Sequence, residues 1–176
     1  MLEEMGYNFE IITADIDEKA IRCDDYYALP VKLACAKAEA VKLKIKEPVL
    51  LITADQVVLS NGELREKPKD ARQAREFLRS YGKYPAEIIN AVVVTNTKNN
   101  KRAQGIDIAK AYFKEIPEEI IDELVKMEDI LNSAGGFLAE HGLLQPYLEK
   151  YEGKEGNSLG LPRVLTENLI LEVQEI

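Results

Sequence analysis

The segment spanning residues 49–59 constrains the fold more than any other part of this chain. It reads VLLITADQVVL, an apolar run that carries a single charge at Asp55, and Asn61-Gly62 follows it. Consecutive apolar residues of this kind predict a strand that is buried on both faces. An Asn-Gly pair predicts a tight hairpin turn, with a return strand over residues 63–66. The chain must therefore build covering layers around this strand.

Helix-like and strand-like patterns alternate along the rest of the chain. A short helical turn ending at Gly6 is expected first, because glycine is the common stop of a helix. Further helices are expected over residues 30–45, 70–81, 117–127 and 163–173. Strands are expected over residues 7–13, 87–96, 105–113 and 143–151. The alternation predicts an α/β domain, and the hairpin predicts a mixed β-sheet flanked by helices.

Charge and composition exclude several classes of protein. The chain has 176 residues and a net charge of −8, so it lacks the positive charge that drives nucleic-acid binding. No apolar run reaches the roughly 18 residues of a membrane span, and the N-terminus lacks a signal-peptide pattern. The two cysteines, Cys23 and Cys35, form no metal-binding pattern and are expected to be reduced thiols. A cytoplasmic protein without membrane or nucleic-acid partners is expected.

Four charged residues are candidates for chemistry. Asp55 follows the continuous apolar run of residues 49–52, where a carboxylate is costly unless a partner or metal compensates it. Glu18 lies in an acidic loop, and one or two carboxylates suit Mg²⁺. Lys37 borders the apolar stripe of its helix, and Lys67 is held extended by the following proline. Each also has a structural alternative: a turn aspartate, a solvated loop acid, a snorkelling lysine and an exposed edge lysine.

These residues by themselves indicate a carboxylate–lysine site for a metal-bound anionic ligand. Their spacing does not name the substrate. Three kinds of protein remain open: a hydrolase, a nucleotide-binding protein without catalysis, and a structural interaction domain. If Asp55, Glu18, Lys37 and Lys67 do not converge in one cleft, neither the hydrolase nor the nucleotide-binding role is supported.

Seven segments, in order, resemble motifs of the Maf-like family of nucleotide pyrophosphatases. They are Leu2-Glu-Glu-Met-Gly-Tyr7, Asp15-Ile-Asp-Glu18, Leu33-Ala-Cys-Ala-Lys37-Ala38, Thr53-Ala-Asp55-Gln-Val-Val58, Gly62-Glu-Leu-Arg-Glu-Lys67-Pro68, Ala134-Gly-Gly-Phe137 and Gly160-Leu-Pro162. The resemblance covers essentially the whole chain. It implies one domain over residues 1–176, with a Maf/ITPase-like mixed α/β fold, a deep cleft and homodimer formation.

The resemblance also implies a hydrolase that depends on a divalent metal, Mg²⁺ or Mn²⁺. Such an enzyme converts a nucleoside triphosphate into a monophosphate and pyrophosphate. By position, Asp55 would be the general base or a metal-linked carboxylate, and Glu18 would assist at the metal. Lys37 and Lys67 would bind the triphosphate.

Two further positions are implied to read the substrate, and others depart from the family pattern. Gln56 and Glu140 resemble the branch that prefers 7-methyl-GTP, although Ala134-Gly135-Gly136 differs from the AGS of that branch. Family members open with a strand and an SxSxxR loop, and this chain starts after that point, so the domain is expected to be truncated at its N-terminus. The residue pairs 84–85 and 90–91 also replace the usual His and Thr-Gly. These departures keep open a nucleotide-binding or regulatory role without catalysis.

Overall fold

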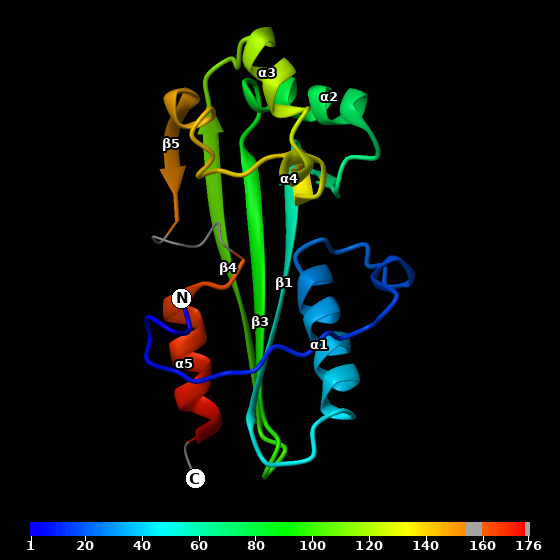
Figure 1. Ribbon diagram of the computed structural model, residues 1–176, viewed down its shortest axis with the longest axis vertical. Coiled ribbons are helices and arrows are strands. Elements are labelled where there is room, and N and C mark those ends of the chain that lie inside the picture. Colours follow the sequence, from blue (N-terminus) through cyan, green and yellow to red (C-terminus); the bar gives the residue numbers. More distant parts are fainter. Residues whose placement is uncertain (154–159, 175–176) are drawn as a thin grey trace.

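The computed structural model describes residues 1–153 and 160–174. A long, twisted five-stranded sheet forms its centre, with helices against both faces (Figure 1). The strands are β1 Leu50–Ser60, β2 Glu63–Arg65, β3 Ala86–Asn96, β4 Arg102–Phe113 and β5 Leu148–Glu152. The α-helices are α1 Leu29–Lys42, α2 Ala71–Tyr81, α3 Glu118–Leu124, α4 Glu128–Leu131 and α5 Arg163–Gln174. Short 3₁₀ helices are η1 Glu18–Ala20, η2 Ala134–Gly136 and η3 Gln145–Tyr147.

The α/β fold expected from the sequence is confirmed, with one difference in strand direction. The strand order is β2-β1-β3-β4-β5, and all four pairings in the described chain are antiparallel, whereas the sequence predicts a mixed sheet. The two tight turns, at Asn61-Gly62 and at residues 97–101, join neighbouring strands directly and fix them as antiparallel. The helix α2 connects β2 to β3. These two strands run in the same direction, but they pair with opposite edges of β1 and are therefore not neighbours in the sheet.

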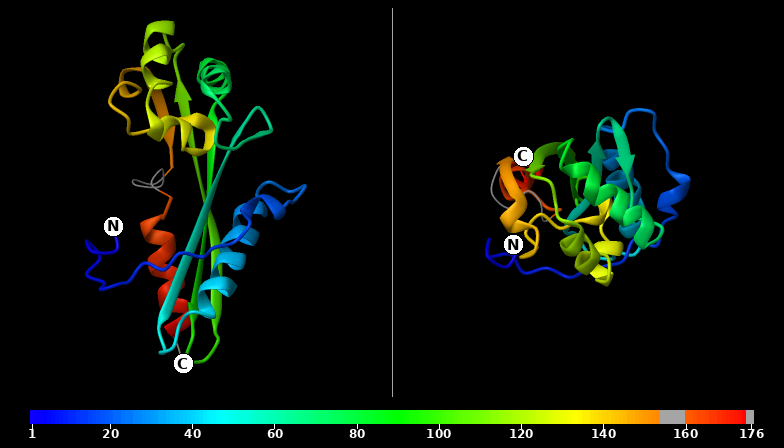
Figure 2. Two further views of the ribbon diagram at one scale, coloured as in Figure 1. Left: turned by 45° about the vertical axis from the view of Figure 1, so that its right-hand side comes forward. Right: turned by 90° about the horizontal axis from the view of Figure 1, so that it is seen from above.

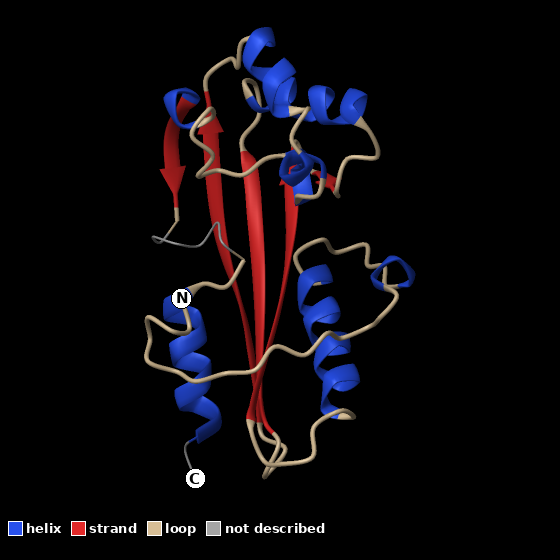
Figure 3. Ribbon diagram, viewed as in Figure 1, coloured by secondary structure: helices blue, strands red, loops and turns tan. Residues whose placement is uncertain are grey.

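The long strand β1 lies between β2 and β3, and its two faces receive different helices. On one face α1 packs against Leu51 and Val93 through Ala34, Ala38 and Val41. The opposite face is divided along its length (Figure 2, Figure 3). One half packs against α5, and the other half packs against the helices α2, α3 and α4. The sheet therefore carries two layers of helices, and α1 alone occupies the side toward which Asp55 points.

The N-terminal segment differs from expectation. Residues 1–6 form one helical turn, closed at Gly6 with φ of +80°, but residues 7–13 are extended and pair with no strand of the described chain. Ile11 is 87% exposed, so the apolar alternation that predicted a strand does not bury its side chains. The segment instead crosses from α5 to α1 (Figure 1), where Lys44 Nζ donates to the carbonyl of Thr13 at 2.7 Å. We refer to residues 7–16 as the strap.

Two other boundaries differ for local reasons. The strand expected over residues 143–151 is limited to β5, since η3, which contains Pro146, occupies the preceding residues. The helix expected over residues 117–127 ends at Leu124 and is followed by the separate helix α4. In the described residues, no helix combines the length and the apolar character that crossing a bilayer requires.

Gly135 should be intolerant of any side chain. Its φ is +73°, and an added Cβ would lie 2.8 Å from Tyr81 Oη and 2.9 Å from Val58 Cγ1. The backbone strain alone costs on the order of 1–3 kcal/mol, and the contacts add to it. We expect Gly135→Ala to lower the free energy of unfolding by at least about 2 kcal/mol in urea titrations. Gly142→Ala is the matched control, because a Cβ there meets nothing within 4 Å. Equal losses in the two variants would contradict this assignment.

Candidate active site

Lys37 joins two carboxylates that are distant in sequence. Its Nζ lies 2.5 Å from Asp55 Oδ1 and 2.9 Å from Glu18 Oε1. The three residues come from different elements: Glu18 from η1, Lys37 from α1 and Asp55 from β1. The Asp55 side chain is 9% exposed, whereas that of Glu18 is 55% exposed. Three of the four residues selected from the sequence thus gather at one point that is open to solvent on the side of Glu18.

The local structure of α1 and β1 places Lys37 beside Asp55. Alternate residues of a strand share a face, so Thr53 and Asp55 both point toward α1. Thr53 Oγ1 donates to the carbonyl of Ala34 at 2.8 Å, which fixes the helix against the strand. Lys37 lies three residues after Ala34, nearly one helical turn along the same face. That spacing brings its ammonium level with the Asp55 carboxylate.

Burial and charge act in opposite directions on this pair. Burial raises the pKa of Asp55 above its ordinary value, and the hydrogen bond from Lys37 only partly offsets that effect. Burial lowers the pKa of Lys37, but its hydrogen bonds to Asp55 and Glu18 outweigh burial, so the pKa of Lys37 ends above its ordinary value. A carboxylate that takes up a proton more readily than usual is better matched to general-base chemistry near neutral pH.

Removing the ammonium should raise the pKa of Asp55 further. In Lys37→Met the carboxylate stays buried but loses its counter-charge. The folded chain then holds the Asp55 proton more tightly than the unfolded chain does. The free energy of unfolding should therefore fall as pH rises from the pKa of Asp55 in the unfolded chain to its pKa in the folded chain. This loss should extend to higher pH in Lys37→Met than in the parent protein. Carboxyl NMR titration of Asp55 measures the pKa, and an unchanged or lower value in Lys37→Met would contradict the expectation.

A cavity of about 470 Å³ adjoins the cluster: Glu18 and Lys37 line it, and Asp55 lies behind Lys37, with which it pairs. Strap residues 12–16, Glu18, Lys37 and β1 residues 52–54 line it, together with Val41. Its walls therefore combine an ammonium and carboxylates with apolar side chains of the strand. Sequence analysis missed the contribution of the strap, because the alternation of residues 7–13 indicated a sheet strand and not a cavity wall.

The other three predicted site residues lie apart from this cluster. Lys67 is exposed between β2 and α2, and no ion pair or hydrogen bond links it to the cluster in the described chain. Gln56 lies on the other face of β1, near Gly160, where an added Cβ would lie 3.4 Å from Gln56 Oε1. Glu140 is exposed in the segment after η2. None of these three residues contacts the Lys37 cluster in the described chain, and their expected roles stay predictions.

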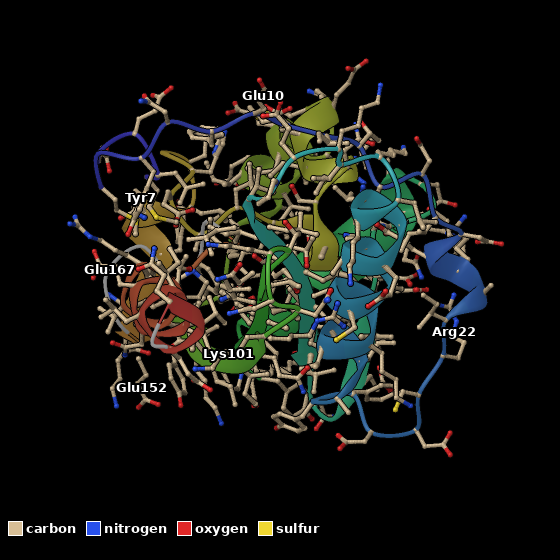
Figure 4. The ribbon with its side chains drawn as sticks, turned by 90° about the horizontal axis from the view of Figure 1, so that it is seen from below. Tyr7, Glu10, Arg22, Lys101, Glu152 and Glu167 are labelled. Carbon is tan, nitrogen blue, oxygen red and sulfur yellow. The ribbon has the colours of Figure 1, made fainter. Side chains whose placement is uncertain are left out.

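Glu66, the neighbour of Lys67, connects three of the expected site segments. Its carboxylate lies 3.4 Å from Arg22 Nη2, and Arg22 follows η1. The carbonyl of Glu66 accepts a hydrogen bond at 3.2 Å from the backbone N–H of Gly135. Arg22 lies at the outer edge of the molecule beside α1, on the side away from α5 (Figure 4). The ion pair between Arg22 and Glu66 links the segment that follows Glu18 to the segment that precedes Lys67. No local sequence pattern predicts this pair, because its two residues are far apart in the sequence.

The expected thiols and metal ligands can also be compared with the structure. Cys23 and Cys35 are both free, as expected. In residues 1–153 and 160–174, no group of three or more Asp, Glu, His or Cys side chains is placed to hold a metal ion. Glu18 and Asp55, the metal ligands expected from the sequence, both contact the Lys37 ammonium.

Known proteins are similar to this chain over nearly its whole length. The model of the family described as Maf-like protein matches residues 1–173. A 7-methyl-GTP pyrophosphatase of Dictyostelium discoideum is 42% identical, over 99% of this chain and 91% of the relative. A nucleoside triphosphate pyrophosphatase of Synechococcus sp. (strain JA-2-3B'a(2-13)) is 32% identical, over 98% of this chain and 87% of the relative. A dTTP/UTP pyrophosphatase of Clostridium novyi (strain NT) is 29% identical, over 92% of this chain and 85% of the relative. The chain belongs to the Maf-like family.

Proposed function

We propose that this protein hydrolyses nucleoside triphosphates to nucleoside monophosphates and pyrophosphate. The observation that carries the proposal is the convergence of Glu18, Lys37 and Asp55 beside a cavity. The names of the relatives support it, since several describe pyrophosphatases that act on nucleoside triphosphates. Three of the four charged residues selected from the sequence meet there, which favours a nucleotide-dependent role over a purely structural domain.

The reaction assigns one task to each residue of the cluster. The oxygen of a water molecule forms a bond to the α-phosphorus, and the bond from that phosphorus to the bridging oxygen of the leaving pyrophosphate breaks. Asp55 takes the proton of the attacking water, for which its raised pKa is suited. Lys37 neutralises charge that builds on the phosphate oxygens. Lys67 is proposed as a second phosphate ligand, presented by the segment that Glu66 ties to Arg22.

A divalent cation, Mg²⁺ or Mn²⁺, fits the donors of this site. Glu18 and Asp55 are hard oxygen ligands from separate segments, and both already approach the same cationic group. Mg²⁺ commonly takes one or two carboxylates from the protein and completes its shell with phosphate oxygens and water. When bound, the cation would neutralise phosphate charge and polarise the α-phosphoryl group. We propose Glu18 and Asp55 as its ligands, with Lys37 moving toward the phosphates.

A methylated guanine nucleotide is the substrate that we propose for this family member. Gln56 and Glu140 suggest it, and the relative from Dictyostelium discoideum carries the name 7-methyl-GTP pyrophosphatase. A carboxylate such as Glu140 accepts hydrogen bonds from the N–H groups of a guanine edge. The homodimer and the cytoplasmic location expected from the sequence remain predictions.

A pyrophosphate-release assay tests the proposal. The full chain is incubated with 7-methyl-GTP, GTP, UTP and dTTP, each with Mg²⁺, with Mn²⁺ or with a chelator. We expect turnover that needs the cation and is fastest with 7-methyl-GTP. Thermal-shift titration with the same nucleotides runs in parallel. Nucleotide binding without release of pyrophosphate would overturn the enzymatic proposal in favour of a nucleotide-binding protein, and absence of both would overturn either role.

A further inference from the structure

A second and larger cavity lies beyond the N-terminal end of α1. Its volume is about 560 Å³, and three segments form it: residues 24–27, the β1–β2 turn at 59–62, and residues 84–87 at the start of β3. No residue of the Glu18, Lys37 and Asp55 cluster lines it. Leu29 and Leu33 of α1 pack against Val57 and Leu59, and this apolar cluster fills the space between the two cavities. The second cavity is therefore a separate site.

The lining of this second cavity combines aromatic rings with negative charge. Tyr27 and Tyr84 both line the cavity and are 41% and 43% exposed, so a ligand could reach their rings. Asp24, Asp25 and Glu87 also line the cavity, and no lysine or arginine does. Tyrosine rings attract cations through their faces, and carboxylates add to that attraction. Such a lining repels phosphates and favours an organic cation.

Hydrogen bonds and an ion pair fix the polar side chains that line this cavity. Glu87 accepts a hydrogen bond from Tyr27 Oη at 2.7 Å, and its other oxygen lies 3.3 Å from Lys110 Nζ. The backbone N–H of Tyr27 donates to Asp25 Oδ1 at 2.9 Å, which fixes the turn that carries this ring. These contacts hold the rim of the cavity in place before any ligand arrives.

We propose that this cavity binds a small methylated organic cation through Tyr27, Tyr84 and the surrounding carboxylates. Two sources share this chemistry: alkylated ammonium compounds and N-methylated heterocycles. The proposal does not depend on hydrolysis at Asp55, because the two cavities share no lining residue.

Amide chemical-shift titration of the full chain tests the proposal with matched probes. Choline is compared with 3,3-dimethyl-1-butanol, which has the same shape without the charge, and 7-methylguanosine is compared with guanosine. We expect the cationic probes to shift amides of residues 24–27, 59–62 and 84–87, and the neutral partners to shift them much less. Response to choline alone identifies an alkylammonium site, and response to 7-methylguanosine alone identifies a heterocycle site; either supports the proposal.

Two variants separate binding from folding. Tyr84→Ala removes an exposed ring and should weaken binding about five-fold or more, whereas Tyr84→Phe should retain it. Failure of every cationic probe to bind would overturn the proposal, as would equal binding of charged and neutral probes or full binding by Tyr84→Ala. Pyrophosphate release measured on the same samples reports separately on the Asp55 site.

Discussion

Replacing Asp55 with Asn should lower kcat for triphosphate hydrolysis by about 10²–10⁴-fold, the usual contribution of a general base. The amide keeps the shape of the side chain but does not accept a proton from water, and it binds a divalent cation less well. Lys37 would keep its contact with Glu18 at 2.9 Å, so the ammonium would not be left buried without a partner. The loss should therefore appear in turnover and not in folding.

The stability of Asp55→Asn distinguishes a chemical role from a structural one. Burial raises the pKa of Asp55, which means that its ionised form is costly in the folded protein, and the neutral amide removes that cost. We expect a Tm close to that of the parent protein. Asp129→Asn, at an exposed position of α4, is the matched control and should retain both activity and Tm. An unchanged kcat in Asp55→Asn would contradict the assignment of Asp55 as the general base.

The parts of the site that could be predicted are those set by short-range patterns. The apolar run before Asp55 and the Asn61-Gly62 turn predicted β1 and its return strand, because burial and turn geometry are local properties. The apolar stripe of α1 placed Lys37 at the margin of the buried face. A lysine there reaches solvent or a nearby carboxylate, and the structure shows that it reaches two.

The parts that could not be predicted depend on long-range placement. Alternation in residues 7–13 does fit a strand, but no strand in the described chain pairs with it, and a strap results. The pair formed by Arg22 and Glu66 joins segments whose separation no sequence spacing specifies. The same holds for the second cavity, where Tyr27 reaches Glu87 across 60 positions. Periodicity reports which face of an element is buried, and it does not report which other element covers that face.

The family motif assigns Lys67 a role that its contacts in the structure do not by themselves indicate. The GxxxxKP segment suggests a phosphate ligand, yet the exposed Lys67 side chain makes no contact with the Lys37 cluster in the described residues. A bound triphosphate would draw an exposed lysine toward it, because an ammonium on a flexible stem adapts to phosphate. The carbonyl of Glu66 accepts a hydrogen bond from the N–H of Gly135, which holds the backbone beside Lys67 in place.

Replacing Phe137 with Ala should cause the largest loss of stability, about 3–5 kcal/mol in the free energy of unfolding. Phe137 is 5% exposed and packs against Tyr81 and Phe113, with ring centroids 5.0 Å and 5.9 Å away. Its removal would leave a cavity among α2, β4 and η2 and would forfeit the edge-to-face contact with Phe113. Urea unfolding followed by circular dichroism measures the loss.

Phe9→Ala is the matched control for this prediction, because it makes the same change in a strap residue that is 44% exposed. Nearly half of this residue stays in contact with water, so Phe9→Ala should lower the free energy of unfolding by less than Phe137→Ala does, by about 1–2 kcal/mol. Since the Phe137 segment also carries Gly135, whose carbonyl accepts a hydrogen bond from Tyr81 Oη at 2.7 Å, Phe137→Ala should also loosen the link from Gly135 to Glu66. Amide exchange at Gly135 should accelerate in Phe137→Ala and remain unchanged in Phe9→Ala. Equal unfolding free energies for the two variants would show that the aromatic cluster does not hold this end of the sheet together.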